Sequence, residues 1–308
     1  MILSCAKFKN FTQLFTLFLI KLLTIRCFFE KIKVVIIMKK ILCLFFVCII
    51  IAVSFCGCGK EHGKIAYNEI IWEYEISKNK VSVKPAFESV GEDLRKYESD
   101  IPSEVYVPSK INGKTVTEIS SFAFAHCFEI EKVVINEGFT KISEGAFLGC
   151  ENLVEIELPK SLKYIETQAL CATGIKSIKL SENFRSFSEK NGEPFFGCEN
   201  LSEIVVSADN HIYASENGVL FSEDMKTLIC YPSAKSVEGY TVPDTVVKIS
   251  NGAFSQTVNL KTLTFPKSVK TVSCDFYKCN IEEITANEKI IDVLKDNKNL
   301  KDTKIKVN

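Results

Sequence analysis

The sequence predicts a mainly β solenoid, a stack of coils in which each coil is one copy of a repeated sequence unit. Two observations predict this fold class. An aromatic residue or leucine recurs at a nearly fixed spacing, and a short strand of alternating apolar and polar residues follows most of these positions. The number of units indicates roughly seven to eight coils, with a β cap at the N-terminal end and a helical cap at the C-terminal end.

The repeated unit has one bulky apolar residue at its centre. Successive spacings between these residues are 23, 23, 25, 59 and 22, and the long spacing marks an insertion. Burying one phenylalanine contributes roughly 1.5–3 kcal/mol, and a single coil cannot do this alone. We therefore expect like residues of neighbouring coils to stack into a row, which consists of Phe124, Phe147, Leu170, Phe195, Phe254 and Phe276.

These units resemble the BspA-type leucine-rich repeat, whose pattern is I-x-x-x-A-F-x-x-C-x-x-L-x-x-I-x-I-P. The segment GAFLGCENLVEIEL at 145–158 shows the pattern well, and the resemblance covers residues 105–285. Leu170 and Thr173 depart from it in the third unit, and Thr257 replaces the cysteine in the fifth. The resemblance implies a leucine-rich-repeat solenoid and relatives that are surface proteins contacting host components, other cells or matrix.

An insertion at 207–243 separates the fourth and fifth units. The turn dipeptide Asn217-Gly218 is followed by a strand-like segment at 219–221, a turn at Glu223-Asp224 and a second strand-like segment at 227–232, so we predict a β-hairpin. The segment resembles the NGVLF…L…YP element of the same family. Two interpretations stay open, a protruding binding loop or a repeat variant that packs beside the coil.

Residues 58–104 lack the unit and are expected to form a linker and the N-terminal cap. Segments 70–76 and 80–87 alternate apolar and polar residues, which predicts a hairpin, whereas 91–102 is polar and predicts a loop. A cap of this kind covers the open end of a solenoid core.

Residues 286–308 are expected to form the C-terminal cap. Helical spacing over 287–300 places Ile291, Leu294 and Leu300 on one side, and a last strand is expected at 304–307.

Residues 38–57 have the features of a lipoprotein signal peptide. A charged start is followed by an apolar run, and the sequence SFCGC then resembles a bacterial lipobox. The resemblance implies that Cys58 becomes the lipidated N-terminus and holds the protein on a membrane, at the cell surface or on an outer membrane. The alternative is a signal anchor that is not cleaved.

Residues 1–37 contain a second apolar stretch, which Lys21 and Arg26 interrupt. Because a complete signal begins at Met38, our interpretation is that translation starts there. An additional hydrophobic membrane segment is the alternative.

The charge distribution argues against a nucleic-acid partner. After position 57 the chain has 30 basic and 37 acidic residues, a net charge of −7, and no concentrated basic face.

Cysteine is the residue type that most suggests chemistry. Cys127, Cys150, Cys198 and Cys279 each lie three residues after the row position, which indicates one repeated core slot. A ladder of reduced thiols is the favoured interpretation, with one disulfide or, less so, a metal site as alternatives.

The sequence predicts no catalytic residue, no metal site and no cofactor. His126 adjoins Cys127, but neighbouring residues of an extended segment point to opposite faces, so this pair makes a poor catalytic dyad. The sequence contains none of the short motifs of hydrolases, zinc proteases or phosphate-binding loops.

The predicted function is therefore a binding or adhesion surface for a protein or glycan partner. A structural envelope protein without a specific ligand is the alternative, and an envelope hydrolase is the least favoured one. Polar positions on the strands would make the contact, and the candidates are Glu155, Glu157, Lys176, Lys179, Glu203 and Lys261.

Overall fold

The computed structural model describes residues 60–78, 80–89, 95–188 and 193–308. The predicted signal peptide, the lipidation site Cys58 and residues 1–37 lie outside these ranges. Within them, no helix has both the length and the apolar character needed to cross a membrane.

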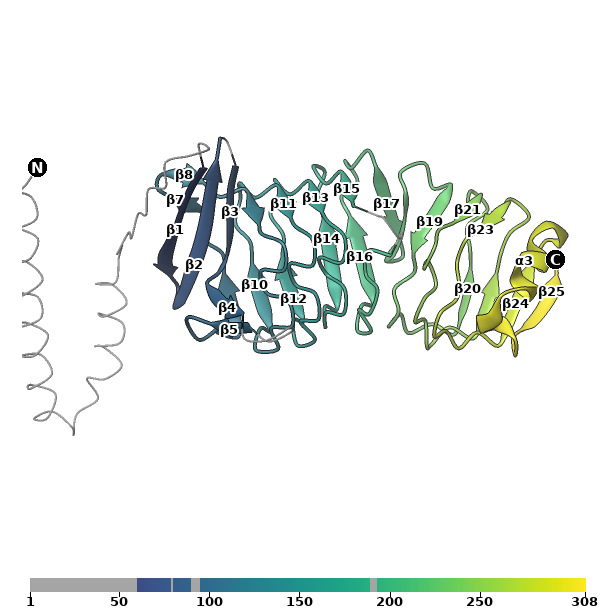
Figure 1. Ribbon diagram of the computed structural model, residues 1–308. Helices are drawn as coiled ribbons and strands as arrows, with labels where there is room; N and C mark the ends of the chain where they lie inside the picture. Colours follow the sequence, from purple (N-terminus) through teal and green to yellow (C-terminus); the bar gives the residue numbers. More distant parts are fainter. Residues whose placement is uncertain (1–59, 79, 90–94, 189–192) are drawn as a thin grey trace, which may run out of the picture. The chain divides into compact units, whose positions relative to one another are not determined.

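The described residues build a β-solenoid of about eight coils, which confirms the predicted fold class. Each regular coil contributes one strand to a front sheet and one to a back sheet, and the strands lie side by side as rungs between β1 and β25 (Figure 1). Apolar side chains fill the space between the two sheets.

The front sheet is interrupted twice along the solenoid. Its strands pair in parallel in three groups, β6 with β10 and β12, β14 with β16, and β20 with β22, β24 and β25. The bounds are β6 Glu104–Tyr106, β10 Lys132–Val134, β12 Glu155–Glu157, β14 Ser177–Leu180, β16 Glu203–Val206, β20 Gly239–Thr241, β22 Thr262–Thr264, β24 Glu283–Ala286 and β25 Lys304–Val307.

The back sheet consists of a seven-stranded part and a five-stranded part. The first runs in the order β1 (Lys60–Tyr67), β2 (Ile70–Ser77), β3 (Lys80–Pro85), β9 (Glu118–Ile119), β11 (Lys141–Ile142), β13 (Tyr164–Ile165) and β15 (Ser186–Phe187). The second runs in the order β17 (Tyr213–Glu216), β18 (Val219–Ser222), β19 (Thr227–Cys230), β21 (Lys248–Ile249) and β23 (Thr271–Val272). Two short hairpins lie outside both sheets, β4 (Phe87–Ser89) with β5 (Arg95–Tyr97) and β7 (Lys110–Ile111) with β8 (Lys114–Thr115).

The predicted row of apolar residues is buried in every unit and stacks within each half of the solenoid. The rings of Phe124 and Phe147 are 5.3 Å apart and almost parallel, at 3°. Phe254 and Phe276 repeat this arrangement at 6.1 Å and 8°. Tyr231 lies 5.5 Å from Phe254 and begins the second row, so the row restarts within the insertion.

The insertion is part of the core and does not protrude. Its strands β17, β18 and β19 form an antiparallel meander, as the predicted hairpin requires. The side chain of Leu220 belongs to the core of the preceding coils, whereas Val219 and Phe221 belong to the core of the following ones. Because all three are fully buried, the packed interpretation describes this segment, and β18 joins two halves of the solenoid.

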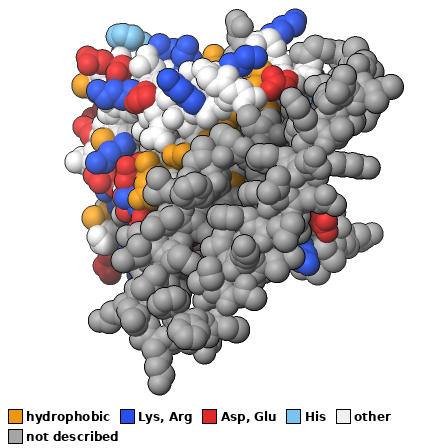
Figure 2. Space-filling model, turned by 90° about the vertical axis from the view of Figure 1, so that its left-hand side faces the viewer, with side chains coloured by type: hydrophobic (Ala, Val, Ile, Leu, Met, Phe, Trp, Pro, Cys, Tyr) orange, Lys and Arg blue, Asp and Glu red, His pale blue; other side chains and the backbone are white. Residues whose placement is uncertain are grey.

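The N-terminal cap contains the predicted hairpin, β2 with β3, and an additional edge strand, β1. Trp72 of β2 is fully buried and meets Phe124 edge-on at 5.7 Å, which closes the first row. The expectation of a loop over 91–102 was wrong for residues 95–97, which form β5 and pair with β4. Side chains of both charges mix on the visible part of this end (Figure 2). Lys60 of β1 and Glu75 of β2 form an ion pair at 2.7 Å.

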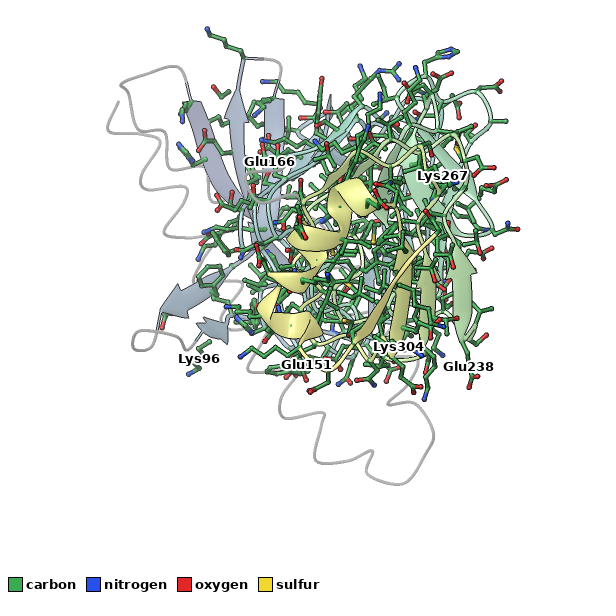
Figure 3. All side chains as sticks on the ribbon, turned by 90° about the vertical axis from the view of Figure 1, so that its right-hand side faces the viewer. Lys96, Glu151, Glu166, Glu238, Lys267 and Lys304 are labelled. Carbon is green, nitrogen blue, oxygen red and sulfur yellow. The ribbon has the colours of Figure 1, made fainter. Side chains whose placement is uncertain are left out.

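The C-terminal cap is helical, as predicted, but the helix is shorter. Helix α3 spans Glu288–Lys295, and a separate 3-10 turn spans Lys298–Leu300. The Asn287 side chain caps the helix by accepting a hydrogen bond from the Lys289 backbone N–H at 3.0 Å. The buried face of α3 covers the end of the core (Figure 3), and the predicted last strand is β25.

A tight turn with a left-handed residue recurs two residues after each row position. The φ angles there are +58° at His126, +71° at Gly149, +53° at Ala172, +81° at Gly197, +62° at Gln256 and +50° at Lys278. Side chains rarely adopt this conformation, so the stacked neighbours must hold it in place. At Gly149 an added Cβ would lie 2.4 Å from the His126 ring, and the close stacking of turns explains the glycine.

Candidate functional site

The outward side of the front sheet, here called the front face, carries the residues that the sequence predicted for partner binding. Within one strand, the first and third residues point outward while the second is buried, as in β12 with Glu155, Ile156 and Glu157. Neighbouring strands repeat this pattern in register, so outward side chains form rows along the solenoid.

An ion-pair cluster occupies the front face at β10 and β12. Lys132 Nζ lies 2.8 Å from Glu155 Oε1 and 2.5 Å from Glu157 Oε1. Hydrogen bonds to Glu155 and then Glu157 raise the pKa of Lys132, and the bond from Lys132 lowers the pKa of Glu155. Because the two carboxylates are exposed while Lys132 is half-buried, water screens the cluster, and the carboxylates remain available to a partner.

The structure brings five of the six predicted binding residues onto adjacent coils. Glu155 and Glu157 lie on β12. Lys176 lies just before β14, Lys179 lies within β14, and Glu203 begins β16. A backbone hydrogen bond from Lys176 to Val154 joins the neighbouring coils where the sheet is interrupted. In the described residues, no ion pair involves Lys176, Lys179 or Glu203.

Lys261 lies apart from the other five, in the half that follows the insertion. It precedes β22, and its Nζ is 2.7 Å from Glu282 Oε1, a bond that raises the pKa of Lys261. The sequence could not show this separation, because the insertion's place in the core decides it.

Exposed apolar side chains on the same face were missed by the sequence analysis. Tyr106, Val154 and Val205 are 40%, 39% and 37% exposed, and they lie on or beside β6, β12 and β16. Tyr106 and Val205 occupy outward strand positions, next to residues that point into the core. Side chains alternate between the two faces of a strand, and this alternation in the sequence could have identified both residues as exposed. Apolar groups among charged ones are typical of surfaces that bind proteins.

In the second to fifth units the interior slot contains a thiol or hydroxyl group that bonds to the backbone, whereas Cys127 of the first unit bonds to the Glu129 carboxylate. Cys150 Sγ donates to the carbonyl oxygen of Phe124 at 3.0 Å, and Cys198 Sγ donates to that of Leu170 at 3.1 Å. Thr173 and Thr257, which replace cysteine, donate to the carbonyl of the row residue in their own coil, at 2.9 and 2.8 Å, whereas the two cysteines reach the row residue of the preceding coil. The slot therefore needs a small donor more than it needs sulfur.

These thiols are poor nucleophiles. Burial raises the pKa of Cys150 to about 12, and burial also raises the pKa of Cys127 and Cys198. Cys127, Cys150, Cys171, Cys198, Cys274 and Cys279 are free thiols, and no group of three or more His, Cys, Asp or Glu in the described ranges could hold a metal ion. His126 is exposed while Cys127 is buried, so the two side chains lie on opposite sides of the chain.

The back sheet contains a buried carboxylate with two lysine partners. Glu118 lies 2.7 Å from both Lys80 and Lys141, and the Ser143 hydroxyl donates to it at 2.6 Å. Burial alone would raise the pKa of Glu118, but the bonds from Lys141, Lys80 and Ser143 outweigh burial and lower it. Since every partner belongs to a neighbouring coil or the cap, this cluster fastens the first coils together.

The fold and its two faces define a solenoid repeat protein whose outer surface varies from coil to coil. Residues 117–238 and 229–307 match the family model described as BspA type leucine rich repeat region, in six copies. This match spans well over half of the chain, and the protein belongs to the BspA-type leucine-rich repeat family.

Solved structures with a similar fold are bacterial leucine-rich repeat proteins. One, from Eubacterium ventriosum, is 22% identical with a TM-score of 0.54, and the similarity covers 78% of this chain and 70% of that one. Another, a leucine rich cell surface protein from Faecalibacterium prausnitzii, is 16% identical with a TM-score of 0.46, covering 80% and 94%. No curated protein matches the chain.

Proposed function

We propose that this protein is a non-enzymatic binding module, held on the outer side of a membrane, whose front face contacts a protein or glycan partner. The observation that carries the proposal is the front face of β6 to β16, where exposed apolar side chains alternate with charged ones on parallel strands. Membership of the BspA-type family supports it, because solenoids of stacked repeats present extended binding surfaces.

Cys58 is proposed as the attachment point to the membrane. The edge strand β1 begins at Lys60, so only one residue separates the proposed lipid from the folded cap. Two or more acyl chains on this cysteine would supply a stable anchor. Cells expressing the full chain should incorporate radioactive palmitate, and the Cys58→Ala variant should not. Equal labelling of the two proteins would refute the anchor and leave the binding proposal standing.

Charge reversal tests the front face. The double variant Glu155→Lys with Glu157→Lys should lose at least tenfold in affinity for a partner captured by the full chain or found on a glycan array, because it turns an acidic cluster beside Lys132 basic. The control is Glu144→Lys with Glu223→Lys, two exposed acidic residues away from the front face. Equal loss in both variants, or in neither, would contradict the proposed surface.

An envelope protein without a specific ligand is the second candidate. If this candidate is right, the wild-type chain captures no partner in the same experiment, although both it and the control variant are folded. The same purified protein should show no hydrolysis of envelope polymers, and turnover would overturn the non-enzymatic proposal.

A further inference from the structure

The outward side of the back sheet, here called the back face, carries a row of basic residues, one at each of five strands. Each residue begins its strand or lies directly before it, and all five side chains are exposed. The members of this basic row are Lys163 at β13, Arg185 at β15, Lys226 at β19, Lys248 at β21 and Lys270 at β23.

Backbone hydrogen bonds place the members of the basic row on neighbouring strands. The N–H of Arg185 donates to the carbonyl of Lys163 at 2.8 Å, and the N–H of Lys248 donates to the carbonyl of Lys226 at 3.0 Å. The N–H of Lys270 donates to the carbonyl that precedes Lys248 in the chain, at 2.8 Å. The row therefore consists of two groups, one in each half of the solenoid, and β17 and β18 of the insertion separate them (Figure 1).

A period of 22 residues hides the basic row in the sequence. Lys163 and Arg185 are 22 residues apart, and the same spacing separates Lys226 from Lys248 and Lys248 from Lys270. Since one coil has about this length, each step returns the chain to the same side of the solenoid. Folding therefore gathers on one face cations that form no basic segment in the sequence.

Few negative charges lie beside the basic row. Aspartate and glutamate are absent from the five segments that carry it, which are 163–165, 185–187, 226–230, 247–249 and 270–272. In the described ranges, Lys226 pairs with the exposed Asp224 at 3.4 Å, and the other four members form no ion pair. Three lysines of the front sheet differ, because each pairs with a glutamate of a neighbouring coil, and they are Lys132, Lys261 and Lys306.

The unpaired charges of the basic row repel one another. Like charges on neighbouring strands destabilise a sheet, and an anionic partner removes this cost. Glu118 and Glu166 of the same sheet do not provide the negative charge, because both are bonded to Lys141, at 2.7 and 3.2 Å. The stability of the coils does not require such a row, and its extent along the sheet fits an extended anionic surface.

The proposed anchor places one end of the back sheet beside a membrane. Strand β1 is the first strand of this sheet and begins two residues after Cys58. Neighbouring strands lie about 4.8 Å apart, so β13 is about 24 Å from β1 along the sheet. The Debye length is about 10 Å at 0.1 M salt, so an upright solenoid would keep the basic row beyond the reach of the headgroup charges. A solenoid that lies on its back face brings the whole row to them.

The strands next to the anchor do not provide this attraction, because their charges are balanced. Lys60 pairs with Glu75 at 2.7 Å, and Lys64 and Lys84 both pair with Glu73, at 3.6 and 3.2 Å. The unbalanced positive charge of the back face therefore lies farther along the solenoid, in the basic row.

We infer that the solenoid lies with its back face on the anionic headgroups of the membrane that holds Cys58, and that the basic row makes this contact. Each exposed cation near an anionic lipid surface adds an attraction that salt screens. The front face, on the other side of the core, then points away from the membrane. The inference rests on the proposed membrane attachment and adds an orientation to it.

Lysine acetylation measures this orientation residue by residue. The full chain, expressed in cells and extracted in detergent, is placed on vesicles of phosphatidylcholine alone or with about one third phosphatidylglycerol. A water-soluble acetylating ester is added, and peptide mass spectrometry gives the initial rate at each lysine. Lys248 and Lys270 should react at least threefold more slowly on the anionic vesicles, whereas Lys176 and Lys179 of the front face should react equally on both.

Salt and charge reversal test the physical cause of the protection. At 1 M salt the Debye length falls to about 3 Å, so the protection should disappear. The variant Lys248→Glu with Lys270→Glu should restore the rate of Lys163 on anionic vesicles. The matched control is Lys298→Glu with Lys301→Glu, two exposed lysines of the C-terminal cap, which should leave the protection of Lys163 intact. Thermal unfolding of both variants should show that they are folded.

Flotation separates the anchor from the orientation. A chain that floats with both kinds of vesicle and has equal lysine rates on them would overturn the inference and leave the anchor standing. Protection of Lys176 and Lys179 in place of Lys248 and Lys270 would overturn it as well. A chain that floats only with anionic vesicles, with the basic row protected, would refute the anchor and support the back-face contact. Flotation with neither kind would refute both.

An acidic glycan is the other occupant that the charge of the basic row fits. Soluble polygalacturonate is added to the chain on neutral vesicles, and the acetylation rates are measured again. Slower reaction of Lys248 and Lys270 with this polymer, without protection on anionic vesicles, would assign the row to a glycan and overturn the membrane contact.

Discussion

The coils before the insertion and those after it have the same interior and different exteriors. In both halves the central rings stack nearly parallel, Phe124 on Phe147 and Phe254 on Phe276. The front face of the first half mixes charged and apolar residues, whereas β20 and β22 of the second expose Gly239, Thr241 and Thr262. Stacking therefore dictates the residue inside each coil and leaves the outward positions free.

The largest expected effect tests whether the two interiors are equivalent. Phe147→Ala and Phe254→Ala should each lower the free energy of unfolding by about 3–5 kcal/mol, because each ring is fully buried and the cavity left behind cannot close. Urea unfolding of the full chain measures this loss. Phe128→Ala is the control, since its ring is 48% exposed, and its loss should stay near 0.5 kcal/mol or below. A loss of stability in only one of the two phenylalanine variants would show that the interiors of the two halves are not equivalent.

The second prediction exchanges the slot residue between the halves. Burial raises the pKa of Cys150 to about 12, above the value of about 8.5 for an unfolded thiol. The folded state therefore keeps its proton longer, and the resulting stability is present below pH 8.5 and lost as the pH rises toward 12. As the pH rises from 8 to 11, the free energy of unfolding should therefore fall less in Cys150→Thr than in the wild type. Urea unfolding midpoints measured over this pH range would show the difference.

The reciprocal variant, Thr257→Cys, sharpens this test. It places a thiol in the same slot of the second half, where the Thr257 hydroxyl donates to the Phe254 carbonyl. Its stability should fall more steeply than wild type over the same pH range. Parallel slopes for wild type and both variants would show that the slot does not set this pH dependence.

The smallest effect separates the front face from the back sheet within the first half. Lys141→Met should lower the free energy of unfolding by on the order of 1–2 kcal/mol, because it leaves the buried Glu118 with Lys80 alone. Lys132→Met, on the exposed front face, should leave the unfolding midpoint unchanged.

A pH series sharpens the lysine comparison. Since the pKa of Glu118 is lowered in the folded state, the stability it contributes is present above pH 4.5 and lost as the pH falls. The difference between wild type and Lys141→Met should therefore shrink below pH 4. A difference that persists there would assign the loss to packing of the lysine stem.

Much of the interior was readable because repetition amplifies a weak signal. A single alternation such as that of residues 155–157 is common, but the same alternation after each buried row residue leaves few alternatives. A helix over 287–300 was also predicted from local apolar spacing, and the structure confirms it for 288–295, where Asn287 caps it. The strand at 95–97 was missed, since its partner β4 is a separate segment and its own residues are polar.

The candidate sites were less predictable. Strand alternation correctly placed Glu155, Glu157 and Lys179 on the outer surface, and their role in binding stays a prediction.

The period of the coils, the residues of the central row and the type of each cap follow from the amino-acid sequence, because they depend on neighbours within one unit or on its copies. The packing of the coils was needed to show that Val219, Leu220 and Phe221 lie between two cores, and that Lys261 lies apart from the other front-face candidates. A strand buried on both sides shows no alternation, so its apolar run fits several placements until the neighbouring coils select one.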